Sequence, residues 1–373
     1  MSKNILIIAI TNLSRSPRPL CQLKALRHKF NVDTMGLKKS GLENNFYKIK
    51  KKSLIVRILK LPLLLFRMYN FYYWDKNKKN VIDQMRGLDY DLIIVHEVRM
   101  LPLAFKISKN AKIILDAHEY SPRNFDDKLI WKIFIKPFYN YLCHKFLSKC
   151  DRVITVCDSI AELYKKNFNI NCHVVTNATD YSDLKPYQSK GDKIRIIHHG
   201  NASSSRKLEL MIDMMGQLDQ RFELYLMLVA KRMNRLYLKK LKRRAKKYSN
   251  VYFLEPVPYN KIIEYSNQFD IGLIFYPPSN INLEYCLPNK LFEFIQSRLC
   301  IVSAPLIEIE KYVVKYNLGI VSKSFSVRDL AKKMNKLSNH EINKYKENSH
   351  YNAQLLSSDL NRGKILKIIE GLI

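Results

Sequence analysis

The stretch Leu287-Pro288-Asn289-Lys290-Leu291-Phe292-Glu293, followed by Cys300-Ile301-Val302-Ser303-Ala304, tells most about this chain. Its pattern predicts a polar loop, a helix that begins near Pro288 and a short buried strand. Proline suits the first turn of a helix because its fixed φ is already near the helical value. The free N–H groups of that turn attract anions, and Lys290 adds a cation beside them. Glu293, one turn on, can accept hydrogen bonds from ribose hydroxyls, so the stretch predicts a nucleotide-diphosphate site without a glycine-rich loop.

The composition allows two domains and suggests an anionic neighbour. The chain has 373 residues, is 47% hydrophobic and carries a formal net charge of +31, from 64 Lys and Arg against 33 Asp and Glu. Such an excess suits nucleic acid, an anionic bilayer or phosphorylated substrates. A generally lysine-rich composition explains the charge equally well. The seven cysteines form no short-spaced pair, so we expect reduced thiols in a cytoplasmic protein. The first residues, 1–4 followed by an apolar strand, lack a small-residue cleavage site, so we expect no signal peptide.

Short apolar runs alternate with stretches of helical spacing along the whole chain. Continuous apolar strands between helices are typical of parallel sheets covered on both faces. The runs form two series of six, which predicts an α/β protein of two doubly wound, Rossmann-like domains, 1–182 and 183–373. The last helix, near 359–372, could pack on either domain. The predicted strands are 5–10, 32–35, 92–95, 112–115, 152–156 and 173–176, then 194–198, 224–229, 251–254, 271–275, 300–303 and 319–321.

Six motifs in order give the chain a resemblance to a known family. They are Leu92–Glu97, Ile113–Glu119, Asp151–Ile160, Val175–Asn177, Ile197–Gly200 with Arg206–Glu209, and Pro288–Glu293. Together they resemble the GT-B glycosyltransferases, in particular family 4 of bacterial polysaccharide assembly. The resemblance implies two parallel sheets that face each other across a cleft, with the donor in the C-terminal domain and the acceptor in the N-terminal domain.

The donor-binding residues follow from the resemblance and from the charge of the side chains. Arg206 can grip a diphosphate through charge-assisted bonds, while a surface cation on a loop is the plainer reading. Lys290 could meet the phosphates of the donor and Glu293 its ribose hydroxyls. The alternative is that the two residues form only an exposed charge pair at positions i and i+3 of a helix. We expect Arg206 and Lys290 to stabilise the leaving diphosphate without a metal ion or other cofactor. The predicted donor-binding residues are Gly200, Arg206, Lys207, Lys231, Asn289, Lys290 and Glu293.

Polar residues after the N-terminal strands predict the acceptor side. His118 follows one predicted strand and His96 ends the neighbouring one. The resemblance implies that His118 is catalytic and meets the transferred sugar or the departing donor, although a purely structural histidine is the alternative. A neutral imidazole can donate to a sugar hydroxyl, and a protonated one can offset phosphate charge. The predicted acceptor-binding residues are Arg18, His96, Glu97 and Glu119. His198 and His199 could each face either the site or the core.

Residues 46–74 combine apolar side chains with lysine and arginine. On one continuous helix, Arg57, Lys60 and Arg67 would share a narrow arc, as in helices that lie in the interface of an anionic membrane. Pro62 would start or kink this helix. Burying these cations in a bilayer would be costly, which argues against a membrane span, and a core helix with a basic outer face is the alternative to membrane contact.

These patterns predict a glycosyltransferase at the inner face of a bacterial cell membrane. It would transfer a sugar, with retention, from a nucleotide-diphosphate donor, first of all a UDP-sugar, to a saccharide or lipid-linked acceptor. Two alternatives stay open at this point. A nucleotide-sugar 2-epimerase would share the fold but leave the basic apolar stretch unexplained. A nucleic-acid-binding protein would use the positive charge, but the sequence has no recognisable module for it.

Overall fold

The computed structural model describes residues 2–189 and 191–373, and its contacts divide the chain into two compact units. The N-terminal unit comprises Met1–Thr176, Asn280–Asn282 and Asn361–Ile373. The C-terminal unit comprises Asn177–Ser279 and Leu283–Leu360. This division falls a few residues before the predicted boundary between residues 182 and 183.

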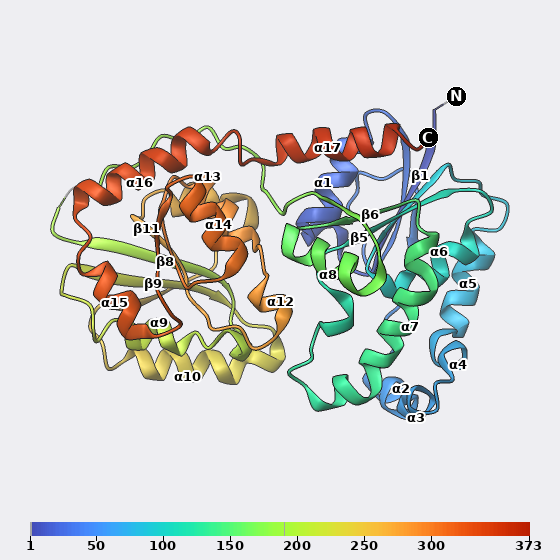
Figure 1. Cartoon of the computed structure of the whole chain (residues 1–373), viewed down its shortest axis with the longest axis horizontal. Helices are drawn as coiled ribbons and strands as arrows, with labels where there is room; N and C mark the ends of the chain where they lie inside the picture. The colour runs from blue at the N-terminus through green and yellow to red at the C-terminus, as the bar shows by residue number, and fades with distance from the viewer. Residues whose placement is uncertain (1, 190) are drawn as a thin grey trace. The chain divides into compact units, whose positions relative to one another are not determined.

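The N-terminal unit is built on a seven-stranded parallel sheet in the order β3-β2-β1-β4-β5-β6-β7, of which Figure 1 labels β1, β5 and β6. Its central strands are buried on both faces because helices cover them, and their residues are almost all aliphatic. Strand order reverses between β1 and β4, where such sheets usually bind ligands beyond the strands' carboxyl ends. The strands are β1 Asn4–Ala9, β2 Asn31–Gly36, β3 Phe46–Lys48, β4 Leu92–His96, β5 Lys112–Ala117, β6 Arg152–Thr155 and β7 Cys172–Val174.

The C-terminal unit repeats this plan with six parallel strands in the order β10-β9-β8-β11-β12-β13. The order of strands is that of a doubly wound dinucleotide-binding sheet, and it reverses between β8 and β11. Both units therefore have the predicted α/β, doubly wound architecture. The strands are β8 Ile194–Asn201, β9 Phe222–Val229, β10 Val251–Leu254, β11 Ile271–Ile274, β12 Cys300–Ser303 and β13 Gly319–Val321.

Helices connect most of the successive strands in both units, although β2 and β3 are joined without one. In the N-terminal unit they are α1 Pro17–Leu26, α2 Leu54–Leu59, α3 Leu61–Leu65, α4 Tyr69–Tyr73, α5 Lys76–Gln84, α6 Leu101–Ile107, α7 Lys136–Phe146 and α8 Asp158–Phe168, with the π-helical turn η4 Trp131–Ile135 before α7. In the C-terminal unit they are α9 Glu209–Met214, α10 Arg235–Ala245, α11 Ile262–Ser266, α13 Asn289–Gln296, α14 Ile307–Lys315, α15 Val327–Met334 and α16 Asn339–Asn352. The short helix α12 Ile281–Glu284 begins in the N-terminal unit's segment 280–282.

The sequence left open on which unit the last helix packs. Most of this helix, α17 Ser358–Glu370, belongs to the N-terminal unit. Ile365 and Ile369 lie in the same buried cluster as Ile5, Ile7 and Leu23. Figure 1 shows the red helix α17 beside α1 and β1. The N-terminal core is therefore completed by residues from the far end of the chain.

The stretch 46–74 differs from the predicted single helix. Its first residues form strand β3, which pairs with β2, and the remainder forms α2, α3 and α4. Pro62 lies in the first turn of α3, as predicted. Lys60 ends α2, and Arg67 has a φ of 55°, which no continuous helix allows. The predicted common arc of Arg57, Lys60 and Arg67 is therefore wrong, because it assumed one unbroken helix.

The described helices include none that is both long and apolar enough to cross a bilayer. All seven cysteines are free thiols in the structure.

Candidate functional site

Gly200 lies near the carboxyl end of β8, beside the point where strand order reverses in the C-terminal unit. Its φ is 130°, a conformation that side chains disfavour. A Cβ built on Gly200 would come within 2.8 Å of the Lys290 Nζ and 3.8 Å of an Arg206 guanidinium nitrogen. The two predicted phosphate-binding cations therefore converge on one glycine backbone, although they are far apart in the sequence.

The orientation of Lys290 depends on how closely α13 packs on the sheet. Gly272 in β11 makes this approach possible, because a Cβ there would lie 2.5 Å from the ring of Phe294. Pro288 is the N-cap residue of α13, and Lys290 follows in its first turn. Lys290 is 7% exposed and Glu293 is 5% exposed. The plainer reading of these two as an exposed surface pair is therefore wrong.

Arg206 reaches Gly200 from the turn η6 Ser204–Arg206, which follows β8. Its guanidinium carbon lies 5.7 Å from the centre of the Tyr276 ring, a distance that suits a cation–π contact. Tyr276 is itself buried and follows β11. The aromatic ring therefore supports Arg206 from one side and leaves its donors directed toward Gly200.

The charges at Gly200 are not balanced. Burial lowers the pKa of Lys290 to about 7, and repulsion by Arg206 adds to this effect, while Glu293 opposes it. Within the described part of the chain the Lys290 ammonium has no hydrogen-bond acceptor. A buried cation without an acceptor is costly, and a bound anion would remove that cost. The arrangement is therefore suited to hold a phosphate or diphosphate.

The carboxylate of Glu293 forms a second part of this site. The Tyr259 side chain forms a hydrogen bond with Glu293, and His199 Nε2 lies 3.6 Å from Glu293 Oε2. Burial raises the pKa of Glu293, whereas Lys290 and Tyr259 act in the opposite direction. Burial lowers the pKa of His199 to about 3, with Lys290 as the second cause. His199 is therefore neutral at physiological pH.

His198 has a structural role, since it is fully buried and its Nδ1 lies 2.8 Å from the carbonyl oxygen of Leu273. Lys207 is exposed and has a left-handed backbone at the end of η6. Lys231 is exposed too and follows β9, next to the carboxyl end of β8. Asn289 is the first residue of α13. The roles of Lys207, Lys231 and Asn289 stay predictions.

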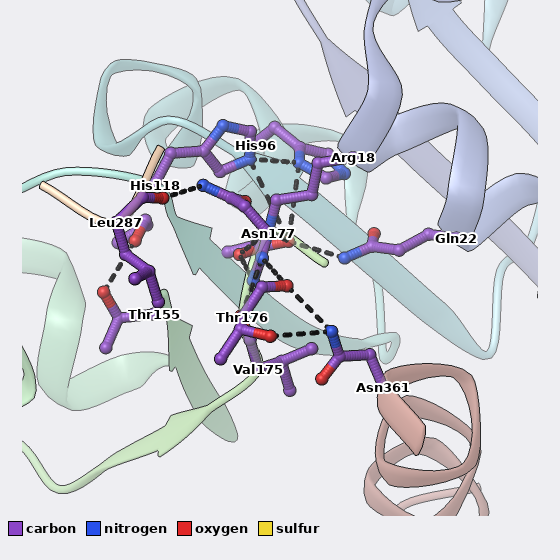
Figure 2. Close-up of polar contacts among 12 residues, drawn as sticks. Arg18, Gln22, His96, His118, Thr155, Val175, Thr176, Asn177, Leu287 and Asn361 are labelled. Carbon is purple, nitrogen blue, oxygen red and sulfur yellow. Dashed lines mark hydrogen bonds and ion pairs between the residues drawn. The ribbon is translucent and has the colours of Figure 1, made fainter. Parts of the chain in front are cut away.

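A buried carboxylate organises the corresponding edge of the N-terminal sheet. Asp116, in β5, is 0% exposed. The Arg18 guanidinium donates to both of its oxygens at 2.7–2.9 Å, and the Gln22 side chain donates to it at 2.5 Å. Figure 2 shows Arg18 and Gln22 projecting from α1 into this network. Arg18 is the largest specific cause that keeps the pKa of Asp116 well below its usual range, against the effect of burial.

His96 and His118 complete the network. His96 Nδ1 lies 2.8 Å from His118 Nε2 and 3.6 Å from an oxygen of Asp116. The prediction that both histidines lie at one edge of the sheet is therefore confirmed. Burial lowers the pKa of His96 to about 3 and that of His118 to about 4, although Asp116 opposes both shifts. Both rings are neutral near pH 7, which favours hydrogen bonding to a hydroxyl over charge compensation.

Arg18 also donates to backbone carbonyl groups of the N-terminal unit. One of its nitrogens donates to the carbonyl oxygens of Val175 and Thr176 at 2.7 and 3.1 Å. Asn361 of α17 donates to the same Thr176 oxygen (Figure 2). This engagement favours a positioning role for Arg18, which orients Asp116, over the predicted contact with the acceptor.

Glu97 and Glu119 line a pocket of about 530 Å³ in the N-terminal unit, together with His118. Glu97 has a φ of 98°, and such strain in a non-glycine residue often accompanies a functional site. Its carboxylate pairs with Arg99. The pKa of Glu119 is raised by desolvation within the pocket and by the nearby charge of Glu97. Three of the predicted acceptor-side residues thus share one cavity, and their contacts with an acceptor stay predictions.

His96, Asp116 and His118 also form a group that could hold a metal ion, since their ligand atoms lie within 4.8 Å of one another. Their present bonds argue against it, because Asp116 is saturated by Arg18 and Gln22 and the two rings bond each other. The sequence also contains an Asp-x-Asp tripeptide, Asp89–Asp91, a spacing that suits a divalent cation. It precedes β4, at the amino ends of the strands, and Asp91 pairs with Lys3. A metal-independent reaction stays a prediction.

The sequence interpretation missed three residues that support the site. Gln22 bonds Asp116, Tyr259 bonds Glu293, and Tyr276 supports Arg206. Tyr276 carried a usable signal, since polar residues directly after a strand of such a sheet lie at its ligand-binding edge. Gln22 and Tyr259 lie in a helix and a turn where nothing in the spacing distinguished them from surface residues.

Comparison with known proteins agrees with this fold. Residues 21–183 match the family model "Glycosyltransferase Family 4". Sucrose-phosphate synthase from Thermosynechococcus elongatus has the same fold, with a TM-score of 0.74, 10% identity, and 99% of each chain covered. The α,α-trehalose 6-phosphate synthase from Burkholderia multivorans gives a TM-score of 0.72 at 11% identity, over 100% of this chain and 99% of that one. An E. coli trehalose-6-phosphate structure bound with UDP-2-fluoro glucose gives 0.72 at 10% identity, over 100% of both chains. No curated protein sequence matches significantly.

The fold and the family match point to one class of protein. The chain has the GT-B fold of these glycosyltransferases. More particularly, residues 21–183, slightly less than half of the chain, match glycosyltransferase family 4.

Proposed function

We propose that this enzyme transfers a sugar, with retention of anomeric configuration, from a UDP-sugar to a saccharide or lipid-linked acceptor in bacterial polysaccharide assembly. The observation that carries the proposal is the convergence of Arg206 and Lys290 on Gly200. Two cations with one nearby carboxylate are a preformed site for a diphosphate. The UDP-2-fluoro glucose bound in one structure of the same fold supports uridine as the nucleotide.

The chemistry follows from the charges at this site. The bond between the anomeric carbon and the diphosphate oxygen breaks, and negative charge develops on the leaving diphosphate. Arg206, Lys290 and the first N–H groups of α13 would offset that charge without moving, which is electrostatic catalysis by a preorganised site. The acceptor hydroxyl approaches on the face that the diphosphate leaves, forms the new bond to the anomeric carbon and passes its proton to the departing diphosphate oxygen. These groups supply the positive charge that a divalent cation would otherwise bring.

The remaining polar groups would position the substrates. Glu293, supported by Tyr259, would accept hydrogen bonds from the ribose hydroxyls. Gly200 would let the diphosphate approach the backbone, with Asn289, Lys207 and Lys231 around it. His118, held neutral and oriented by His96 and Asp116, would donate to a sugar hydroxyl. Glu97 and Glu119 would bind acceptor hydroxyls in the adjoining pocket.

The cellular setting is part of the proposal. The exposed apolar and basic residues of 46–74 support a peripheral enzyme at the inner face of the cell membrane. Arg57 in α2 and Arg67 after α3 would face lipid phosphates, and the apolar side chains would enter the interface.

Calorimetry with a panel of UDP-, GDP- and ADP-sugars tests the donor site. We expect one UDP-sugar to bind in the micromolar range and Arg206→Gln to weaken it at least tenfold, since one charge-assisted diphosphate contact is lost. Lys239→Gln, on the exposed face of α10, removes the same charge as a control. A trace silent toward every activated sugar would overturn the proposal.

Steady-state kinetics tests the ribose role of Glu293. The variant Glu293→Gln should raise the donor KM several-fold and lower kcat less, because the ribose contact is the same in the ground state and the transition state. Tyr259→Phe should act in the same direction but more weakly. An unchanged donor KM in Glu293→Gln would argue against ribose binding.

A further inference from the structure

The pocket of about 530 Å³ in the N-terminal unit has a chemistry that sugar binding alone does not explain. Six of its lining residues are cations and two are carboxylates. Six of its lining residues are aromatic. The cations are Lys50, Lys51, Lys52, Arg57, Lys78 and Arg99, and the aromatic residues are Tyr72, Tyr73, Trp131, Phe138, Tyr139 and Phe125.

The cations of this pocket differ in their interaction partners. Lys52 and Lys78 both pair with Asp75, and both donate to the carbonyl oxygen of Tyr73, so they hold the fold together. Burial lowers the pKa of Lys52 to about 8, and the charge of Lys78 contributes to this shift. Lys51 and Arg57 are exposed at the pocket, and the described residues provide no ion-pair partner for either. The pocket therefore keeps uncompensated positive charge for a ligand.

An exposed apolar surface adjoins this pocket. In α2–α4 it includes Leu59, which is 73% exposed, Phe66, which is 71% exposed, and Phe71, which is 67% exposed. A second segment, which the sequence interpretation did not single out, presents Leu129 at 71% and Ile130 at 61% exposure. The two sets belong together because α3 packs against η4, which directly follows Ile130. Such a contiguous apolar surface with cations beside it is typical of contact with an anionic bilayer.

The polar end of the pocket contains the predicted acceptor residues. His118, Glu119 and Glu97 line the same cavity as the cations and the aromatic wall. A single ligand could therefore present a sugar hydroxyl to the carboxylates, a phosphate to Lys51 and Arg57, and a hydrocarbon chain to the aromatic rings.

We propose that this pocket binds the phosphate of a membrane-borne lipid acceptor, while the exposed apolar residues of α2–α4, together with Leu129 and Ile130, rest in the bilayer interface. The inference builds on the proposed glycosyl transfer and names its acceptor class. Sugars that carry a phosphate share the ligand chemistry, but a soluble phosphosugar would gain nothing from the exposed apolar surface. The lipid therefore explains the cations, the aromatic wall and the apolar surface together.

Vesicle flotation of the full chain tests the inference. Three vesicle types are compared: phosphatidylcholine alone, phosphatidylcholine with phosphatidylglycerol, and phosphatidylcholine with a polyprenyl phosphate at the same surface charge. We expect strongest binding to the polyprenyl phosphate vesicles. The double variant Lys51→Gln/Arg57→Gln should lose that preference and bind about tenfold or more weakly, since each cation near an anionic surface adds up to about 1 kcal/mol. The matched control Lys239→Gln/Lys240→Gln removes two exposed charges from α10 and should keep the preference.

A second pair of variants tests the exposed apolar side chains that we propose to contact the membrane. Leu129→Ser/Ile130→Ser should weaken flotation several-fold on all anionic vesicles. Leu236→Ser/Val314→Ser removes two equally exposed apolar side chains from the C-terminal unit and should leave flotation unchanged. Equal losses in both pairs would overturn the assignment of the membrane-contacting surface.

Competition separates the lipid from soluble sources. Millimolar inorganic phosphate or glucose 6-phosphate should leave the preference for polyprenyl phosphate largely intact. Displacement at micromolar concentration would overturn the lipid assignment in favour of a soluble phosphosugar. Calorimetry of the same preparation with UDP-sugars keeps the two proposals apart. Normal donor binding without lipid preference refutes only this inference, whereas absent donor binding refutes the proposed function.

Discussion

Lys290 shows how one residue serves the site at a cost to the fold. Its ammonium is buried beside Arg206, and among the described residues the carboxylate of Glu293 is the main group that compensates its charge. A stabilising mutation would be easy to find there, since an apolar side chain of similar length would avoid the desolvation of a charge. A cation kept in such a place is typical of functional sites, where pKa values are shifted by burial and by neighbouring charges.

The pH dependence of donor binding follows from Lys290. Its pKa in the free protein is about 7, and a bound diphosphate would stabilise the protonated form. Above pH 7 donor binding must therefore take up a proton, so we expect affinity to fall as pH rises, by up to about tenfold per pH unit. UDP-glucose suits the measurement because its diphosphate does not titrate in this range. The variant Lys290→Met should bind more weakly and lose this dependence. A constant wild-type affinity between pH 6 and 9 would contradict the prediction.

The lowered pKa of Lys290 also predicts that the stability of the donor-free protein increases with pH. The unfolded chain binds the Lys290 proton more tightly than the folded protein does, because the folded pKa lies below the ordinary value of 10.5. The contribution of Lys290 to the free energy of unfolding should therefore rise as pH increases from about 7 toward 10.5. Denaturant titrations of wild type and Lys290→Met across this range isolate the contribution.

Gly200 is the second residue on which the donor site depends. In Gly200→Ala the new methyl group would meet Lys290, and the φ of 130° would be strained. We expect donor affinity to fall at least tenfold and the free energy of unfolding to fall by about 1–3 kcal/mol. Gly363→Ala is the matched control, since no atom lies within 4 Å of a Cβ there, and alanine in a helix should stabilise by up to about 1 kcal/mol. Wild-type donor affinity in Gly200→Ala would contradict the assigned geometry.

At the scale of elements, two helices connect distant parts of the chain. Helix α13 carries Lys290 and Glu293 and packs on β11 through Gly272. Helix α17 crosses from the C-terminal unit into the N-terminal core, where Ile365 and Ile369 are buried. Asn361, in the same helix, donates to the carbonyl oxygen of Thr176, to which Arg18 also donates. The N-terminal site is therefore coupled to a helix that comes last in the sequence.

Helix α17 should be essential for the stability of the N-terminal unit. Ile369→Ala removes a side chain that is 1% exposed, and we expect a loss of about 2–4 kcal/mol in the free energy of unfolding. Leu360→Ala makes a similar change at a half-exposed position of the same helix and should cost less than about 1 kcal/mol. Chemical denaturation measures both variants. Equal losses would mean that α17 does not complete the core as described.

The whole molecule repeats one doubly wound plan twice, and this repetition guides the choice among functions. In each sheet, the residues that we assign to a site lie at or near the carboxyl ends of strands next to the reversal of strand order. A nucleic-acid-binding protein would have no use for these two buried, chemically different sites. An epimerase would need only the donor site and would leave the basic, aromatic pocket of the N-terminal unit without a role.

The net charge of +31 has several sources at this scale. Part of it lies on exposed helix faces such as that of α10. A smaller part is concentrated in the two sites, where burial makes each charge more effective than at the surface. Composition alone could not separate these contributions, since it counts a solvated lysine and Lys290 alike.

By itself, the sequence determined the repeated strand–helix pattern, the helix at Pro288 and the residues that carry charge near it. These features are local, because continuous apolar runs and helix-start residues act within a few positions of the chain. It did not reveal β3, whose three residues are too few for a periodic signal, or the breaks between α2, α3 and α4. Only the tertiary structure decided that Lys290 and Arg206 meet at Gly200, that Arg18 is committed to Asp116 and that α17 belongs to the N-terminal core. Those contacts join residues far apart in sequence, and their energies depend on burial, which no local pattern specifies.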